Sequence, residues 1–199
     1  MSLKALFYDW GGLNTWLFHA ANNLQGDLWG CLMLLGTALG DHDNFLYYLG
    51  GLVVITLVGL WYTPRARWAF LFTVPVVFVL GYYLDDLLIT SLKDLFDYPR
   101  PLLALPASTV HVLGAPKFHH SFPSGHTTFA TLLAASLWPI LNFKCRIIAV
   151  LFVLWVGLSR IVLGAHFPAD VMGGALVSLI VCSSLWYFFM SLNRLKTHD

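Results

Sequence analysis

The stretch SRIVLGAHFPAD, from Ser159 to Asp170, places a histidine and an aspartate at a spacing suited to nucleophilic chemistry. Gly164 permits a turn, and Pro168 is expected to begin a helix that carries Asp170 in its first turn. The Asp170 carboxylate can then accept the Nδ1–H of His166 and leave Nε2 free to act. No cysteine lies nearby and Ser159 is a full turn or more away, so His166 is itself the candidate nucleophile. The alternative is a histidine and a helix-start aspartate that pair at the membrane interface without doing chemistry.

Two basic residues in the segment KDLFDYPRP are placed to hold an anion. A helix leaving the membrane would carry Lys93 to its end. The prolines that follow would stop this helix and leave Arg100 in an extended segment close by. Two cations would then converge on one anion. The alternative is a pair of interface-anchoring side chains with Asp94 and Asp97 as partners.

The sequence FPSGH, from Phe122 to His126, is typical of a helix start. Ser124 is expected to cap this helix, and the free backbone N–H groups near Gly125 would attract an anion at the aqueous face. His126 lies in the first turn of the same helix. This motif is a weak signal by itself, because an ordinary surface histidine at a helix start gives the same pattern.

Together with Arg160, these clusters supply three cations, two histidines and a helix N-terminus at one membrane surface. Phosphoryl transfer requires cations and N–H donors around the equatorial oxygens, an in-line nucleophile and an acid for the leaving oxygen. No acidic cluster is evident on that face to hold Mg²⁺. We therefore expect a phosphoryl-transfer reaction that uses neither a metal nor another cofactor.

The composition is that of an integral membrane protein. Of the 199 residues, 58% are hydrophobic and 11% are charged, and the mean hydropathy is +0.74. This apolar share is well above that of ordinary soluble domains. The net charge of +1 gives no sign of a nucleic-acid partner, and no long polar stretch marks a second domain. We expect residues 1–199 to form one domain in the lipid bilayer, and the oligomeric state stays open.

Five apolar runs have nearly or fully the roughly 20 residues that a helix needs to cross the hydrocarbon core. They are Phe45–Tyr62, Trp68–Ser91, Ser124–Leu141, Ile147–Leu163 and Val171–Leu192. The runs lack the alternating pattern of barrel strands. We predict an all-α polytopic transmembrane bundle of five or six spans, with a five-span core over residues 45–192. Residues 1–44 are expected to form an interfacial helix pair or one bent span, because their apolar pieces are short and broken at NNLQGD.

The distribution of lysine and arginine predicts the orientation of the bundle. Six of these residues fall on one side if the five runs alternate: Arg65, Arg67, Lys144, Arg146, Arg194 and Lys196. By the positive-inside rule that side is cytoplasmic. Four cations fall on the opposite side, where the rule expects few: Lys93, Arg100, Lys117 and Arg160. We expect these four to have a function, so the active site would face the periplasm or the exterior.

The combined pattern resembles that of the type 2 phosphatidic acid phosphatase superfamily. It consists of K-x-x-x-x-x-x-R-P from Lys93, P-S-G-H from Pro123 and S-R-x-x-x-x-x-H-x-x-x-D from Ser159. All eleven specified residues are present in the right order. The motifs extend from about Lys93 to Asp170, and the flanking spans fit the helical core of that superfamily.

The resemblance implies a histidine phosphatase that needs no metal. His166 would attack phosphorus and form a phosphohistidine, Asp170 would raise its nucleophilicity, and His126 would protonate the leaving oxygen. Water would then hydrolyse the intermediate. The residues that would bind the phosphoryl oxygens are Lys93, Arg100, Ser124, Gly125 and Arg160.

The resemblance also implies a membrane lipid phosphate or pyrophosphate as substrate, because small bacterial members act on such lipids at the outer face of the inner membrane. The short N-terminal region is similar to that of compact undecaprenyl pyrophosphate phosphatases, so undecaprenyl pyrophosphate is the expected substrate. Phosphatidylglycerophosphate, phosphatidate and lipid A are the alternative substrates. The alternative functions are a lipid phosphotransferase, which would form the same phosphohistidine, and a non-catalytic lipid-binding or transport protein.

Four further polar residues have no role that the sequence settles. Asp85 and Asp86 lie inside an apolar run, where an ionised carboxylate is costly unless it is paired. Asp86 precedes Lys93 by seven residues and so lies on the same helix face about 10 Å away. A link to the phosphate site and simple structural pairing are both open for these carboxyls. His119 and His120 belong to a loop that would roof the site, where they either contact a headgroup or lie in solvent.

Overall fold

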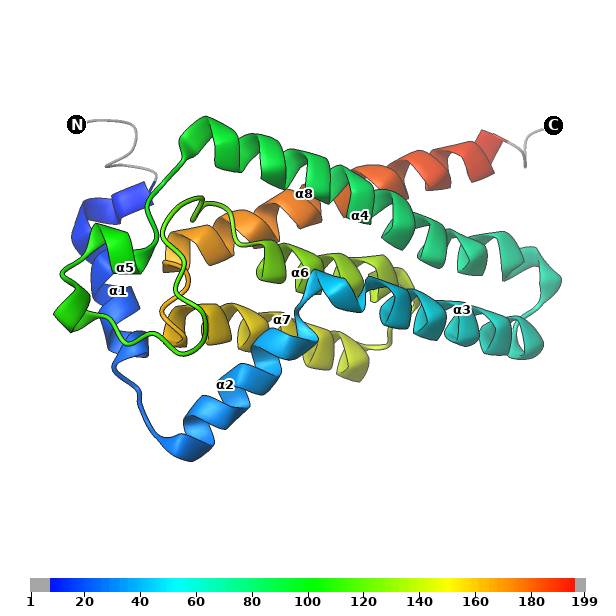
Figure 1. Ribbon diagram of the computed structural model, residues 1–199. Helices are drawn as coiled ribbons and strands as arrows, with labels where there is room; N and C mark the ends of the chain where they lie inside the picture. The colour runs from blue at the N-terminus through cyan, green and yellow to red at the C-terminus, as the bar shows by residue number, and fades with distance from the viewer. Residues whose placement is uncertain (1–7, 196–199) are drawn as a thin grey trace.

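The computed structural model describes residues 8–195, without the side chains of residues 66 and 193–195. Within this range the chain forms helices and contains no strand (Figure 1). The α-helices are α1 (Leu13–Asn22), α2 (Asp27–Leu39), α3 (Phe45–Tyr62), α4 (Trp68–Phe96), α5 (Pro101–Ala104), α6 (Gly125–Leu137), α7 (Phe143–Val162) and α8 (Pro168–Leu195). The 3-10 turns are η2 (Trp10–Gly12), η3 (His42–Asn44), η4 (Arg65–Arg67), η5 (Ala107–Thr109) and η6 (Trp138–Ile140). The predicted all-α class is confirmed.

Helix α6 lies at the centre of the bundle (Figure 1). It packs against α4, α7 and α8, while α3 packs on α4 and α2 packs on α7. Phe129 and Leu132 of α6 meet Phe78 of α4 and Trp186 of α8 in the largest cluster of buried hydrophobic side chains. Because three helices surround α6, its first residue, Gly125, is fixed relative to the ends of α4 and α7.

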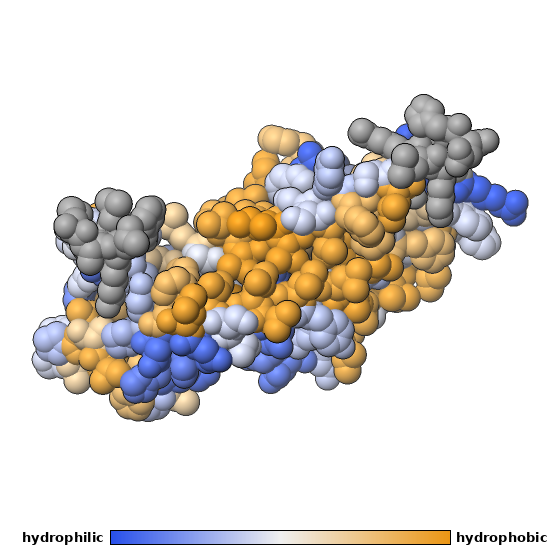
Figure 2. Space-filling view, turned by 90° about the horizontal axis from the view of Figure 1, so that it is seen from above, coloured by the Kyte–Doolittle hydropathy of each residue, from blue (hydrophilic) through white to orange (hydrophobic). Residues whose placement is uncertain are grey.

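The outside of the bundle is hydrophobic, as a lipid-facing surface must be. Figure 2 shows a broad hydrophobic area over the middle of one face. Four helical stretches are long and apolar enough to cross a membrane: His42–Tyr62, Trp68–Ala104, Phe143–Val162 and Pro168–Leu192. These stretches confirm the predicted polytopic helical bundle.

The predicted number of five or six spans is not confirmed. The run Ser124–Leu141 forms α6, which has 13 residues, and the short turn η6, which contains Pro139. This length is below the roughly 20 residues of a full span. Polar residues such as Thr128 and Ser136 also interrupt its hydrophobic pattern, and they are buried against neighbouring helices instead of facing lipid. By length and composition the described residues therefore supply four candidate spans.

The N-terminal segment forms two separate helices, α1 and α2, with a break where the sequence reads NNLQGD. The interfacial pair and the bent span, the two predicted alternatives, both contain such a break and both stay predictions. The Asn22 side chain donates to the carbonyl oxygens of His111 (2.7 Å) and Val162 (2.9 Å). Asn14 accepts a hydrogen bond from the N–H of Ala169 (2.9 Å). These buried contacts join the segment to the end of the bundle where α7 and α8 meet.

The two ends of the bundle differ in the way that the sequence predicted. The α3–α4 and α6–α7 connections lie toward one end, with the cations Arg65 and Lys144 (Figure 1). The side chain of Arg194 and the whole of Lys196 lie outside the described residues. Helix α5 and the loop after it lie at the opposite end, where α4 and α7 finish and α6 and α8 begin.

The end of α4 is formed as expected. Asp97 adopts a left-handed conformation with φ 35°, and its N–H donates to the carbonyl oxygen of Lys93 (2.8 Å). Arg100 follows in extended conformation with ψ 162°, immediately before Pro101 begins α5. A left-handed residue ends a helix because the next N–H groups turn away from its axis. The chain therefore turns back across the bundle end within a few residues of Lys93.

Candidate active site

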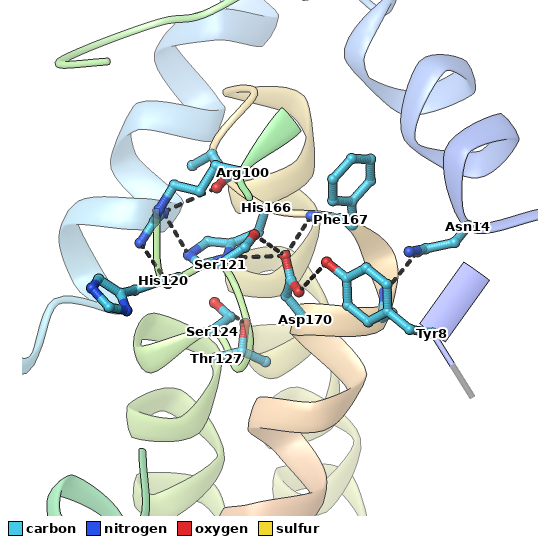
Figure 3. A network of polar contacts seen from close by, with 12 residues as sticks. Tyr8, Asn14, Arg100, His120, Ser121, Ser124, Thr127, His166, Phe167 and Asp170 are labelled. Atoms are coloured by element: carbon cyan, nitrogen blue, oxygen red, sulfur yellow. Dashed lines mark hydrogen bonds and ion pairs between the residues drawn. The ribbon is translucent and has the colours of Figure 1, made fainter. Parts of the chain in front are cut away.

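The Arg100 guanidinium is held over His166 by a set of carbonyl oxygens (Figure 3). Its Nε donates to the carbonyl of His119 (2.8 Å), and Nη1 donates to that of Ala165 (3.0 Å). Nη2 donates to the carbonyl of His120 (3.3 Å). Nη1 also lies 3.1 Å from Nε2 of His166. The Arg100 side chain is 7% exposed, so its position is set by protein contacts.

The contact with Arg100 determines the tautomer of His166. A guanidinium has donors only and stays protonated in proteins, so Nε2 must accept with its lone pair. The proton of the neutral ring is then on Nδ1, which lies 3.3 Å from Oδ2 of Asp170. This is the orientation predicted from the spacing of His166 and Asp170.

The Asp170 carboxylate is completely buried and has three further donors. Oδ1 accepts from the Tyr8 hydroxyl (2.8 Å), and Oδ2 accepts from the Ser121 hydroxyl (2.5 Å) and the N–H of Phe167 (2.8 Å). Charge-assisted hydrogen bonds of this kind compensate for the lost hydration of a buried carboxylate. They also fix the plane of the carboxylate toward the imidazole of His166 (Figure 3).

His166 is uncharged near neutral pH. Burial lowers the pKa of His166 to about 4, against an opposing effect of the hydrogen bond with Asp170, and the charge of Arg100 lowers it further. The side chain is 2% exposed. A neutral imidazole with a lone pair on Nε2 is the nucleophilic form of histidine.

The PSGH motif begins α6, as predicted, but Ser124 does not cap the helix with its side chain. Ser124 occupies the N-cap position, and its side chain accepts no capping hydrogen bond there. Instead it accepts from the Thr127 hydroxyl (3.2 Å), and its backbone N–H donates to the carbonyl of Asp170 (2.9 Å). The N–H groups of the first turn lack intrahelical acceptors, which suits them to an anion.

Lys93 and Gly125 meet at one side of this helix start. Nζ of Lys93 lies 4.0 Å from the place that a Cβ on Gly125 would occupy. Both residues line a cavity of about 130 Å³ between α4 and α6, together with Asp85 and Asp86. Asp86 and Lys93 therefore lie on the same face of α4, as predicted. Asp85 is 4% exposed, and its carboxyl interacts with the hydroxyl of Ser178, which is also buried.

His126 and Arg160 meet at the other side of the helix start, around a second cavity of about 240 Å³. Nε2 of His126 lies 3.5 Å from Oδ2 of Asp41. The Arg160 guanidinium is 8% exposed, donates from Nη1 to Thr37, and has no hydrogen-bond partner at Nε. The fold thus brings all eight predicted site residues to one end of the bundle.

Five residues of this region carry no assignment from the sequence: Tyr8, Thr37, Asp41, Lys117 and Ser121. The first three belong to the N-terminal segment and lie far along the chain from the motifs. One sequence feature pointed to a function for Lys117, since it is among the four cations on the side of the membrane where few are expected. His119 and His120 contribute their carbonyl oxygens to Arg100, while their side chains are exposed beside Asp97.

One group of side chains has the composition of a metal site. The ligand atoms of Asp41, His42 and Asp43 lie within 4.8 Å of one another at η3. His42 and Asp43 are exposed at the surface, and Asp41 lies beside His126. Exposed acidic groups at a helix start are common without an ion, so this group has no assigned function.

Comparison with known proteins places the three motifs in one family. The sequence pattern of the PAP2 superfamily matches residues 70–194, which include all three motifs and exclude the N-terminal segment. Undecaprenyl-diphosphatase BcrC of Bacillus subtilis is 38% identical over 96 residues, which are 48% of this chain and 47% of that protein. This chain is thus aligned with only about half the length of that relative.

Two longer matches cover most of the chain. Phosphatidylglycerophosphatase B of Haemophilus influenzae is 27% identical over 92% of this chain and 89% of its own length. The crystal structure of Aquifex aeolicus LpxE has a TM-score of 0.71 and 28% sequence identity, and the match covers 88% of this chain and 95% of that one. The names of the two curated relatives agree with the predicted class of enzyme, a phosphoric ester hydrolase. Since the family pattern covers more than half of the sequence, the chain belongs to the PAP2 superfamily.

Proposed function

We propose that this protein is a metal-independent lipid phosphatase that acts through a phosphohistidine on an isoprenoid or glycerolipid (pyro)phosphate. The observation that carries the proposal is the orientation of His166. Its Nδ1–H faces the buried Asp170 carboxylate, and its Nε2 lone pair faces Arg100 at 3.1 Å. A neutral imidazole held in this way beside cations is arranged to attack a phosphorus atom.

The first step forms the intermediate. A phosphoryl oxygen takes the hydrogen bond of the Arg100 Nη1, which frees the Nε2 lone pair of His166 to attack phosphorus. The N–P bond forms as the bond to the leaving oxygen breaks, and His126 gives its proton to that oxygen. Burial and the charge of Arg160 lower the pKa of His126 in the free protein, so His126 must take up this proton together with the anionic substrate, whose charge favours the imidazolium. Asp170 stabilises the positive charge that develops on the ring.

The second step returns the enzyme to its starting state. Water gives a proton to His126 and attacks phosphorus, and the N–P bond breaks to leave neutral His166 and free phosphate. Lys93, Arg160 and the N–H groups at the start of α6 neutralise the phosphoryl oxygens in both steps. These donors perform the charge stabilisation that other phosphatases obtain from metal ions.

The substrate is proposed to be a lipid because the site lies at the end of a bundle whose sides are hydrophobic. A lipid headgroup at the membrane surface can reach this end while its chains stay in the bilayer. Undecaprenyl pyrophosphate is our first choice, with phosphatidylglycerophosphate, phosphatidate and lipid A as alternatives. We place the protein in a bacterial inner membrane with the site facing the periplasm or exterior.

The test is phosphate release by the detergent-solubilised protein with EDTA present. Undecaprenyl pyrophosphate, phosphatidylglycerophosphate and phosphatidate would be compared with wild type and with His166→Ala. Lys144→Ala is the control, because Lys144 is exposed at the start of α7, at the opposite end of the bundle. We expect EDTA-resistant release that His166→Ala abolishes and Lys144→Ala retains. Release that requires added Mg²⁺, or that persists in His166→Ala, would refute the proposed mechanism.

A second readout separates catalysis from binding. Brief incubation with a substrate labelled with ³²P at the transferred phosphorus, followed by rapid denaturation at alkaline pH, should trap an acid-labile phosphoprotein in wild type and none in His166→Ala. A protein that only holds the headgroup would bind the lipid without acquiring the label.

A further inference from the structure

The cavity of about 240 Å³ beside His126 has a cationic lining that the phosphoryl site does not fully explain. It lies between the end of α2, the loop that follows α5, the start of α6 and the end of α7. Its polar lining comes from Thr37, Asp41, Lys117, His126 and Arg160, and Leu34 and Leu113 are among its apolar residues. Lys117 belongs to the loop and is no part of the family motifs.

The positive charge in this cavity exceeds the negative charge. Asp41 is the one carboxylate among the described residues that line it, and its Oδ2 lies 3.5 Å from His126. Burial acts to raise the pKa of Asp41, but the Asp43 N–H and His126 outweigh that effect and hold it below its ordinary value, so Asp41 is ionised. Neither Lys117 nor Arg160 has a carboxylate oxygen within 4.0 Å among the described residues.

Two observations indicate that Asp41 alone does not balance these cations. Nε of Arg160 is buried and has no hydrogen-bond partner. Partial burial, together with the charges of Arg100 and Arg160, lowers the pKa of Lys117 below its ordinary value. Like charges gathered in this way repel one another, and an anionic ligand would relieve the repulsion.

The position of His126 indicates which part of the substrate would occupy the cavity. This step rests on the proposed function, in which His126 protonates the leaving oxygen. A general acid must lie within hydrogen-bond reach of that oxygen, so the leaving group extends to the side that His126 lines. That side is the cavity with Lys117.

We propose that this cavity binds a leaving group that itself carries an anionic phosphate, and that Lys117 is a ligand of that second phosphate. The leaving group of a lipid diphosphate is a lipid monophosphate, and that of phosphatidylglycerophosphate contains a phosphodiester. The leaving group of phosphatidate is an uncharged diacylglycerol. Lys117 therefore selects substrates that have a second phosphate.

The test compares kcat/KM for undecaprenyl pyrophosphate, phosphatidylglycerophosphate and phosphatidate in wild type, Lys117→Ala and Lys117→Arg. A hydrogen bond to a charged group contributes enough to change kcat/KM by about tenfold to a hundredfold. We expect Lys117→Ala to lower kcat/KM by at least about tenfold for one or both substrates with a second phosphate. The loss for phosphatidate should be several-fold smaller, and Lys117→Arg should restore most of the selectivity.

The arms of the experiment separate the two sources of the second phosphate. Loss confined to undecaprenyl pyrophosphate assigns the cavity to diphosphates, and loss confined to phosphatidylglycerophosphate assigns it to phosphodiesters. Lys144→Ala is the matched control, since Lys144 is exposed at the start of α7 at the opposite end of the bundle. Melting temperatures of all variants would show whether a loss of activity reflects loss of folding.

Two results would overturn the inference while the proposed function stands. One is an equal loss for all three substrates in a folded Lys117→Ala variant, which would place Lys117 at the transferred phosphoryl group. The other is no loss for any substrate. If wild type releases phosphate from none of the lipids, or His166→Ala retains release, the proposed function fails and the inference fails with it.

Discussion

At the scale of single residues, the central feature is a histidine whose two ring nitrogens have opposite roles. Arg100 and Asp170 hold Nε2 as an acceptor and Nδ1 as a donor. Because the ring is 2% exposed, its charged form lacks hydration and is disfavoured despite the nearby carboxylate. The proposed nucleophile is thus kept neutral by its burial, and Asp170 orients its ring.

The buried neutral histidine makes folding stability depend on pH. The folded-state pKa of His166 is about 4, and an unfolded histidine titrates near 6.5. As pH falls below about 6.5 the unfolded chain takes up this proton first, so the free energy of unfolding decreases until about pH 4. The full loss in the free energy of unfolding is about 3 kcal/mol at low pH, and this loss is absent above pH 6.5.

We therefore expect wild type to lose more thermal stability than His166→Gln between pH 7.5 and pH 5, measured as the change in Tm in detergent. Both proteins share every other titrating group of the chain, so the difference isolates His166. An identical change in Tm for the two proteins would mean that His166 is not kept neutral by the fold.

Tyr8 is a positioning residue for Asp170, through its hydrogen bond of 2.8 Å to Oδ1. Its hydroxyl is buried, and burial with the nearby Asp170 charge raises the pKa of Tyr8, so it remains a donor. Tyr8→Phe removes this donor and keeps the ring that packs on Tyr98. We expect kcat to fall by about tenfold with little change in KM, because Tyr8 bonds Asp170 and lines neither of the two cavities at the site.

The control for this prediction is Tyr62→Phe, since Tyr62 is 81% exposed at the other end of the bundle. Steady-state phosphate release measures both variants. If Tyr8→Phe raises KM and leaves kcat intact, the hydroxyl serves in substrate binding, and the positioning role is wrong.

At the scale of elements, the contact between α6 and α8 sets the position of the PSGH motif. A Cβ on Gly174 of α8 would lie 2.4 Å from the carbonyl oxygen of Ser124 and 2.9 Å from the hydroxyl of Thr128. The nearest of these atoms is backbone, which cannot move aside as a flexible side chain does. Gly174 therefore permits the close approach that holds the start of α6 beside Asp170.

Gly174→Ala is expected to lower stability by about 1–3 kcal/mol, the usual cost of overpacking, and to lower phosphate release. Gly50→Ala on α3 is the matched control, because a Cβ there would meet nothing within 4 Å. Tm and activity should both fall for the first variant and be retained for the second. Unchanged values for Gly174→Ala would show that α8 can shift without disturbing the site.

At the scale of the whole molecule, the candidate site and the α3–α4 and α6–α7 connections lie at opposite ends of the bundle (Figure 1), and the face between them is hydrophobic (Figure 2). The positive-inside rule predicts that the α3–α4 and α6–α7 connections lie in the cytoplasm. The loop that contains Pro116 and Lys117 would lie on the outer side of the membrane.

Reporter fusions after Pro116 and after Phe143 test this orientation in cells. We expect a signal for the outer side at Pro116 and a cytoplasmic signal at Phe143. A cytoplasmic signal at Pro116 would reverse the orientation and place phosphate release inside the cell.

The sequence alone determined the helical class and the eight residues of the motif set. Each motif lies at a helix end, and helix ends are specified locally by proline, glycine and the loss of apolar residues. Lys93 and Arg100 lie on either side of the end of α4, and His166 and Asp170 lie on either side of the start of α8. The sequence spacing of each pair therefore determines how the two side chains lie relative to each other. The span count was harder to predict, because the hydropathy of α6 does not reveal how much of its surface is covered by other helices.

Only the tertiary structure decided which partners complete the site. Tyr8 and Asp170 are 162 residues apart in the sequence, and Arg160 and Thr37 are 123 residues apart. No local pattern marks Tyr8, Thr37 or Asp41, because their positions depend on where α1 and α2 pack on α7 and α8. The same holds for the cavity beside His126, which exists only where four separate segments meet. Short-range spacing therefore specifies the orientation of His166, the proposed nucleophile, whereas long-range packing specifies the other groups around the proposed substrate site.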